Sequence, residues 1–564
     1  MQNWDETYDF VIAGSGGGGM MAAIAAHDKG LKTLIVEKNK TFGGSTSLSG
    51  GALWIPNNSF MKSEGISDSE EEGIKYMNSA IGDRTTKARQ ETYVKVGPEM
   101  IDYIEKHTEV EFQRIPGYSD YYPELPGGNA IGRTLEPVPF NKKRLGDWRV
   151  KMNPPIWPLM EKFPVTGKEY HKMSMMRTTS AGKKQLAKTL GRLIKAKVKG
   201  QKTCSMGQAL IGMLALSVKN RNIPLWLNSP IKDLVVENGK VVGAMVEKEG
   251  KIVRVKANKG VLLATGGFPH NQAMRDKYMQ QPVKSEWSLA NKTNEGDGIN
   301  IGLKLDAAID IMEDAWWGPA SILTDGTPFF HVSERAQPGS IVVNKKGKRF
   351  TNEAKPYAEM VHILYEKNKE EEGSTIPCYI IFDSKFRKKY SFGIKPAGIV
   401  PKKDLESGYF TRANTIKELG EKLGLDADNL HETVLNYNKM AEVGKDTEFG
   451  KGDSAYDKYY GDPSVEPNPC MLPILKPPFY CVKLYPGDLG TKGGLVTNEK
   501  AEVLKTDGSV IEGLYATGNT TASVMGNTYP GAGATIGATM IFGYVAAHEV
   551  ASKVKDQAKA SATA

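Results

Sequence analysis

Cysteine, histidine and long apolar runs are scarce in this sequence. Its 564 residues include four cysteines with no CxxC pair and eight histidines with no HxxxH spacing. We therefore expect neither a disulfide framework nor a metal site. No apolar run is long enough to mark a membrane-spanning helix, and Met1 leads almost directly into the first predicted strand, which leaves no room for a secretory signal. These features favour a reduced, soluble, cytoplasmic protein.

A strong charge imbalance is also lacking. The 74 basic and 65 acidic residues leave a net charge of +9, which is modest for this length. The sequence has no zinc-finger spacing and no basic groove interleaved with aromatic residues, so we expect no nucleic-acid partner. The length exceeds what one hydrophobic core usually serves, so we expect two domains.

Glycine is abundant, and a dense group of glycines follows the first apolar run. Residues 8–13 predict a buried strand, the glycines lead into an apolar helical pattern, and residues 33–36 predict the next parallel strand. This order is typical of a dinucleotide-binding unit, because glycine lets the backbone approach a pyrophosphate and the acid after the second strand holds a ribose hydroxyl. The residues predicted to contact the dinucleotide here are Gly14, Ser15, Gly16, Gly17, Gly18, Gly19, Glu37 and Lys38.

Small residues also gather in later segments. The loop FGGSTSLSGGALWIPNN (42–58) fits close against a cofactor and offers hydroxyl hydrogen bonds. The strands predicted in GVLLATGGF (260–268) and GLYATGN (513–519) end in the same small-residue turn, so both should open onto one cofactor. A glycine loop at 527–534 leads into an apolar helix. The free N–H groups at the start of such a helix can point at an electron-rich group of a ligand. The cofactor contacts predicted in these later segments are Gly44, Ser45, Thr46, Ser49, Gly50, Gly51, Thr265, Gly266, Asp297, Gly518, Asn519, Thr535 and Ile536.

The residue pattern of the sequence changes from about residue 311. A tryptophan pair, Pro/Gly turns and a charged helical region indicate an inserted domain, after which the chain returns to its first pattern. We predict an α/β fold in which a Rossmann-like domain is interrupted by a smaller α+β domain. The predicted limits are 1–310 for the first part of the Rossmann-like domain, with a basic helical insert at about 130–205, then 311–490 for the inserted domain and 491–564 for the returning part.

Residues 183–202 are strongly basic. They carry eight Lys or Arg, and their apolar residues lie on one face at helical spacing. Such a helix fits an anionic lipid surface, and it equally fits an ordinary surface helix packed on its own domain. Peripheral contact with a membrane is therefore one of two interpretations of this segment.

Seven motifs in order carry a family resemblance: the N-terminal glycine unit, GGST…SGG, ATGGF, NKKGKRFTNE, DLGTKGG, GLYATGN and the terminal helix. With them the chain resembles the fumarate reductase/3-ketosteroid dehydrogenase flavoproteins. GYSDYYPE, the Trp-Trp pair, NEAKPY and NTYPGAGATIG are similar to the 3-ketosteroid Δ1-dehydrogenases within that family. The resemblance implies FAD as the cofactor, bound non-covalently because no histidyl attachment motif is evident, and catalysis in a catalytic domain inserted into an FAD-binding domain.

The resemblance also assigns four catalytic groups. It makes Tyr357 the base that takes the C2 proton of a 3-ketosteroid, with Tyr121 beside it, while Tyr529 and the backbone N–H of Gly533 polarise the ketone. The fumarate reductase branch has an arginine where RFTNEAKPY places Tyr357, and the terminal loop lacks an HGxNR pattern. Arg335 alone poorly serves a substrate with two carboxylates, so a neutral ketone is favoured.

Other functions stay open at this stage. A related flavoprotein could act at the Δ4-(5α) bond of the steroid, a fumarate-reductase-like enzyme would need more arginines, and a non-catalytic flavin or lipid-surface protein belongs to a different class. The sequence shows no second NAD(P)-binding motif. We therefore expect the 3-ketosteroid to pass its electrons to an external acceptor such as a quinone or another carrier.

Overall fold

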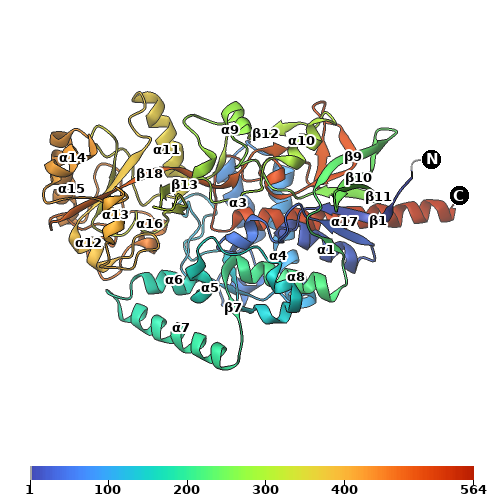
Figure 1. The fold of residues 1–564 in the computed structure, drawn as a ribbon, viewed down its shortest axis with the longest axis horizontal. Helices are drawn as coiled ribbons and strands as arrows, with labels where there is room; N and C mark the ends of the chain where they lie inside the picture. Colours follow the sequence, from blue (N-terminus) through green and yellow to red (C-terminus); the bar gives the residue numbers. More distant parts are fainter. Residues whose placement is uncertain (1–2, 564) are drawn as a thin grey trace.

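The computed structural model describes residues 3–563 (Figure 1). Its larger sheet has a parallel core flanked by shorter strands, in the order β20-β21-β11-β1-β2-β8, with β10 paired to β11 and β9 to β10. The strands are β1 (Glu6–Ala13), β2 (Thr33–Val36), β8 (Leu225–Trp226), β9 (Ile231–Glu237), β10 (Lys240–Lys248), β11 (Lys251–Leu263), β20 (Glu502–Leu504) and β21 (Val510–Ala516). The central strands are apolar and buried, as expected for a parallel sheet covered on both faces.

Four parallel strands end at the same edge of this sheet. Ala13 is in register with both Val36 and Leu263, and Leu263 is in register with Ala516. Because carboxyl ends of parallel strands meet at one edge, the segments that follow them gather there although they are far apart in sequence. This edge lines a large cavity.

Two helices from opposite ends of the chain pack against each other through glycines. Helix α1 (Gly17–Asp28) packs against α17 (Ala534–Thr563), which forms the red helix of Figure 1. A Cβ added to Gly18 would lie 2.6 Å from the Thr539 carbonyl oxygen, and one added to Gly543 would lie 2.4 Å from that of Gly18. Glycine at these positions therefore allows the two helix backbones to meet.

The second sheet lies on the opposite side of the molecule from β9 and β10 in Figure 1. It is antiparallel, in the order β14-β13-β18-β16-β15, with β17 paired to β18. Its strands are β13 (Ala315–Ile322), β14 (Pro328–Phe330), β15 (Ser340–Val343), β16 (Cys378–Phe382), β17 (Thr411–Ala413) and β18 (Phe479–Thr491). Helices α14 (Ile416–Leu423) and α15 (Ala427–Val443) share a separate apolar cluster with this sheet.

The remaining elements are short or connect these layers. The helices are α2 (Ser59–Ser63), α3 (Glu70–Ile81), α4 (Lys87–His107), α5 (Pro158–Lys162), α6 (Gly167–Ser174), α7 (Ser180–Val198), α8 (Met206–Asn220), α9 (Gln272–Tyr278), α10 (Asp297–Leu303), α11 (Tyr357–Glu370), α12 (Ser384–Lys389), α13 (Lys402–Glu406) and α16 (Ala455–Tyr460). The 3-10 turns are η1 (Ser45–Leu48), η2 (Lys142–Val150), η3 (Ser285–Trp287) and η4 (Gly518–Thr520). The remaining strands are β3 (Leu53–Trp54), β4 (Phe112–Arg114), β5 (Thr134–Pro137), β6 (Phe140–Asn141), β7 (Thr203–Cys204), β12 (Ile309–Asp310) and β19 (Gly494–Leu495).

The predicted mixed α/β architecture is confirmed. The strands of the larger sheet come from the two ends of the chain, and those of the second sheet come from the middle. The exact limits of the two domains remain a prediction. No helix among residues 3–563 is both long enough and apolar enough to cross a membrane.

The basic insert contains several elements, of which α7 is the longest helix. Helix α7 packs mainly against α6 and extends from the body of the molecule at the lower edge of Figure 1. Its outer face exposes three apolar side chains one turn apart, with 42% of Leu190, 63% of Ile194 and 82% of Val198 exposed. Helix α7 thus packs on α6 by one face and exposes the other, and both interpretations of this segment stay open.

Candidate active site

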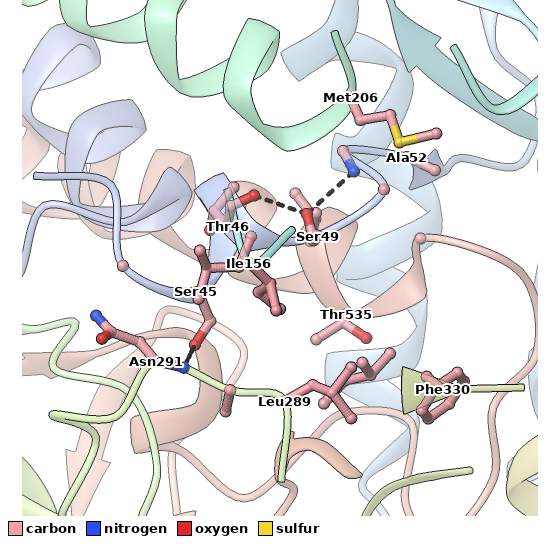
Figure 2. A pocket seen from close by; sticks show the side chains of 18 of the residues that line it. Ser45, Thr46, Ser49, Ala52, Ile156, Met206, Leu289, Asn291, Phe330 and Thr535 are labelled. Carbon is pink, nitrogen blue, oxygen red and sulfur yellow. Dashed lines mark hydrogen bonds between the residues drawn. The ribbon is translucent and has the colours of Figure 1, made fainter. Parts of the chain in front are cut away.

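One cavity of about 740 Å³ begins at the carboxyl edge of the larger sheet and continues between the two sheets (Figure 2). All the predicted cofactor and catalytic residues line it except Gly17, whose N–H donates to Thr46 Oγ1 at 3.1 Å. The structure thus brings together side chains that are more than 500 residues apart. Their individual roles remain predictions.

The N-terminal glycines form the floor of the cavity. Gly14 has φ +112°, and an added Cβ would lie 2.1 Å from the Ala264 carbonyl oxygen. Helix α1 begins after Gly16 without a side-chain cap, so its first N–H groups are available to an anion. Glu37 lies at the end of β2, where its carboxylate accepts hydrogen bonds from the Ser15 N–H at 3.1 Å and hydroxyl at 2.6 Å. These features fit the pyrophosphate and ribose of an FAD.

Lys38 and Asp297 form a bridge across the rim of the dinucleotide end. Lys38 Nζ lies 2.6 Å from Asp297 Oδ2 and 3.1 Å from Glu295 Oε2. Burial alone would lower the pKa of Lys38, but the two carboxylates raise it above its ordinary value. The lysine therefore stays charged and links two segments about 260 residues apart.

The glycine–serine loop is held rigid by its own hydroxyls. Ser45 Oγ accepts a hydrogen bond from the Asn291 N–H at 2.9 Å, and Ser49 Oγ donates to the Thr46 carbonyl at 2.7 Å (Figure 2). The N–H of Gly51 donates to Ser49 Oγ at 3.0 Å. A loop fixed in this way lines the cavity with backbone groups in set positions.

Three tyrosines meet in the part of the cavity beyond the dinucleotide end. Their ring centroids are 5.4 Å apart for Tyr121 and Tyr357, 5.5 Å for Tyr357 and Tyr529, and 5.1 Å for Tyr121 and Tyr529. The Tyr121 hydroxyl donates to the Tyr357 hydroxyl oxygen at 2.7 Å. Tyr118 follows at 3.4 Å from the Tyr121 hydroxyl, and Tyr460 donates to Tyr118. A row of hydroxyls therefore leads away from Tyr357.

Tyr529 is held by the segment that begins α17. Its hydroxyl oxygen accepts a hydrogen bond from Thr535 Oγ1 at 3.0 Å, and its ring packs edge-on against Trp316 at 4.8 Å. Gly533 has φ +96°, and an added Cβ would lie 2.4 Å from backbone atoms of Ala52. Only glycine fits there without strain, and its N–H lies near the Tyr529 phenol.

Burial dominates the acid–base behaviour of the three phenols. It raises the pKa of Tyr357 and of Tyr121 well above the ordinary value, and neighbouring tyrosines add to the effect. Burial also raises the pKa of Tyr529, although Thr535, Tyr357 and the Gly533 N–H oppose it. Tyr357 is the first residue of α11, where the positive end of the helix favours a negative oxygen.

Cationic side chains are nearly excluded from this chamber. Among the described residues, no arginine lines the cavity, and its two lysines are Lys38 and Lys395. Arg335 is fully buried elsewhere and donates to backbone carbonyls of His331 and Glu353. A substrate with two carboxylates would find few partners here.

Much of the cavity wall has no sequence motif. The basic insert contributes apolar side chains to it, and β14 and the segment after it add aromatic and acidic ones. These residues are Trp157, Phe163, Tyr170, Met173, Met176, Phe329, Phe330 and Glu334. The available signal was the presence of aromatic residues and methionines within an otherwise basic insert.

Comparison with known proteins identifies the family. The family described as FAD binding domain matches residues 9–536, so the chain belongs to this family of FAD-binding proteins. The chain is 44% identical to the 3-oxosteroid 1-dehydrogenase of Mycolicibacterium smegmatis, over 97% of this chain and 98% of that protein. The resemblance inferred from the motifs and the expectation of FAD are thereby confirmed.

Solved structures place the chain on the same fold. The crystal structure of 3-ketosteroid delta1-dehydrogenase from Sterolibacterium denitrificans in complex with 1,4-androstadiene-3,17-dione superposes with a TM-score of 0.93 at 38% identity, covering 97% of this chain and 100% of that one. The 3-ketosteroid-delta4-(5alpha)-dehydrogenase of Rhodococcus jostii RHA1 has a TM-score of 0.68 at 21% identity, covering 98% of each chain. The second similarity concerns the fold alone.

Proposed function

We propose that this chain is an FAD-dependent 3-oxosteroid 1-dehydrogenase, which introduces a double bond between C1 and C2 of a 3-ketosteroid. The observation that carries the proposal is the meeting of three phenols at the apolar end of a dinucleotide cavity. The reaction removes a proton from C2 and a hydride from C1. Bound FAD supplies the hydride acceptor.

Tyr529 and Gly533 bind the ketone oxygen in this proposal. The Tyr529 oxygen already accepts a hydrogen bond from Thr535, so its own proton is free to be donated to the C3 oxygen. The Gly533 N–H supplies a second donor. Negative charge develops on that oxygen as the C2 proton leaves, and donors fixed in advance stabilise it most in the transition state.

Tyr357 accepts the C2 proton on its phenol oxygen. The hydrogen bond from Tyr121 and the N-terminus of α11 both stabilise the phenolate, which is the form that acts as a base. The hydroxyls of Tyr121, Tyr118 and Tyr460 then offer a route by which the proton leaves the buried site. The apolar wall keeps water from competing for the enolate.

Anaerobic flavin reduction tests the proposal. We expect the flavin absorbance near its visible maximum to bleach when a 3-oxo-4-ene steroid is mixed with the enzyme in a stopped-flow instrument, and not when succinate, the dicarboxylate that donates electrons, is mixed with it. Mass spectrometry and NMR should locate the new double bond between C1 and C2. If the flavin is bleached instead by a 5α-saturated 3-ketosteroid that becomes unsaturated at the 4,5-position, and not by the 4-ene steroid, the result would favour a Δ4-(5α)-dehydrogenase. Absence of bleaching with every ketosteroid would favour a non-catalytic flavoprotein.

We also propose that α7 rests on an anionic membrane surface. The exposed stripe of Leu190, Ile194 and Val198 is flanked by the lysines of a segment with eight basic residues. Helix α6, on which α7 packs, contributes Tyr170 and Met173 to the cavity wall. A docked α7 would therefore bring the cavity close to lipid, where both a steroid and a quinone-type electron acceptor dissolve.

A further inference from the structure

Glu334 is a buried carboxylate on the wall of the cavity. Only 3% of the residue is exposed, and it follows β14 on the chain. Its Oε1 accepts a hydrogen bond from the Gly393 N–H at 3.0 Å and lies 3.6 Å from His331 Nδ1. The Glu334 backbone N–H also lies near the carboxylate, and among the described residues no hydrogen bond from another residue reaches Oε2. A carboxylate has about four acceptor positions, so Glu334 can accept a further hydrogen bond from a ligand.

A neighbouring hydrogen-bond chain keeps this carboxylate charged. Ser321 Oγ lies 2.7 Å from His331 Nε2 and 3.0 Å from the Tyr409 hydroxyl. If Tyr409 donates to Ser321 and Ser321 to Nε2, the proton of the imidazole is on Nδ1, which faces Glu334. Burial alone would raise the pKa of Glu334, but His331 together with the backbone N–H groups of Glu334 and Gly393 outweighs it and holds that pKa below the ordinary value. Glu334 therefore acts as a hydrogen-bond acceptor at neutral pH.

Glu334 lies outward from the catalytic tyrosines along the cavity. The Phe330 ring is 5.0 Å from that of Tyr357, and the Phe329 ring is 5.0 Å from that of His331. The same part of the wall includes the partly exposed Tyr170 and Ile394, which mark the outer end of the cavity. A steroid whose C3 ketone contacts Tyr529 must direct its D ring away from the tyrosines, towards this outer wall.

We propose that Glu334 selects steroids by the group at their D-ring end, favouring a hydroxyl donor over a ketone or a carboxylate. The proposal rests on the proposed dehydrogenase function. A hydroxyl there would supply the donor that Oε2 lacks, and a hydrogen bond to a buried carboxylate is stronger than one between neutral groups. A ketone offers only an acceptor, which leaves the carboxylate unsatisfied, and a second carboxylate adds repulsion between like charges.

The test compares Glu334→Gln with the wild-type holoenzyme on steroids that differ only at C17. The three substrates are a 17β-hydroxy, a 17-keto and a 17β-carboxylate 3-oxo-4-ene steroid. We expect the ratio of kcat/KM for the hydroxy to the keto steroid to fall about tenfold or more in the variant, as for loss of one charge-assisted hydrogen bond. The carboxylate steroid should gain by a similar factor. The change should appear mainly in KM, because the contact is remote from the reacting carbons.

Glu366→Gln, an exposed substitution on α11, is the matched control and should leave every ratio unchanged. An unchanged hydroxy-to-keto ratio in Glu334→Gln would overturn the inference. If that variant does not retain flavin, Glu334→Asp provides the second test, because it keeps the charge but withdraws it by one methylene and should lower the ratio partially. Turnover of none of the three steroids by the wild-type enzyme would instead count against the dehydrogenase function itself.

Discussion

At the scale of single residues, the site depends on phenols whose surroundings work in opposite directions. Burial raises the pKa of Tyr357 well above its ordinary value, which disfavours the base. The Tyr121 hydrogen bond at 2.7 Å and the start of α11 favour the phenolate. Only a small fraction of Tyr357 is therefore phenolate at neutral pH, but that phenolate is a strong base in the apolar chamber. The same chamber keeps water away from the enolate.

Replacing Tyr357 by Phe tests its assignment as the base. We expect kcat to fall by about two to four orders of magnitude, the usual contribution of a positioned acid or base. FAD content should stay the same, because the ring and its packing are retained. In the wild-type enzyme kcat should rise with pH, since the phenolate is the active form and its pKa lies above the neutral range. Steady-state kinetics across pH measures both effects, and near-normal turnover by the variant would remove Tyr357 from this role.

At the scale of elements, α7 combines an exposed apolar face with a position next to the cavity wall. Its stripe of Leu190, Ile194 and Val198 is exposed, while the neighbouring α6 lines the cavity. An exposed apolar stripe beside lysines is costly in water and favourable at an anionic interface. The arrangement couples a surface helix to the wall of the steroid cavity through one helix–helix contact.

The double change Leu190→Glu and Ile194→Glu should weaken binding to vesicles that contain anionic lipid. We expect the partition coefficient to fall at least about tenfold, because burial of one large aliphatic side chain is worth roughly 1.5–3 kcal/mol. Flotation of the holoenzyme with liposomes measures it. Leu435→Glu and Val443→Glu on α15 serve as the control, since those side chains are also exposed. Equal flotation of all three proteins would contradict the membrane contact.

The sequence predicted the sites that depend on local backbone geometry. Gly14 and Gly533 were predictable because a positive φ and a close backbone approach require glycine within a recognisable strand–loop–helix order. Glu334 was not predictable, because its importance arises from His331 and Gly393 and from the outer end of a cavity formed by distant segments. The ion pair between Lys38 and Asp297 was not predictable for the same reason, although each residue was predicted to contact the cofactor.

At the scale of the whole molecule, the cofactor site joins both ends of the chain. Segments after β1, β2, β11 and β21 meet around one cavity, together with the start of α17. A ligand that bridges such segments stabilises the folded state by mass action.

Removal of FAD should therefore lower the melting temperature of the protein, and adding it back should restore it. At an FAD concentration of about 100 Kd the expected stabilisation is about 2.7 kcal/mol. Differential scanning fluorimetry of the deflavinated protein measures the shift. FMN is the matched control, because it lacks the adenosine half that would reach Glu37, and it should stabilise less. Identical melting temperatures with FAD and without it would argue against a bridging cofactor.

The contact between α1 and α17 also bears on biosynthesis. Gly18 and Gly543 touch backbone to backbone, so the first helix of the chain meets its permanent neighbour only after residue 543 has been translated. Flavin loading into a completed cradle must accordingly follow the synthesis of α17, and a polypeptide truncated before α17 would be unable to retain the yellow chromophore.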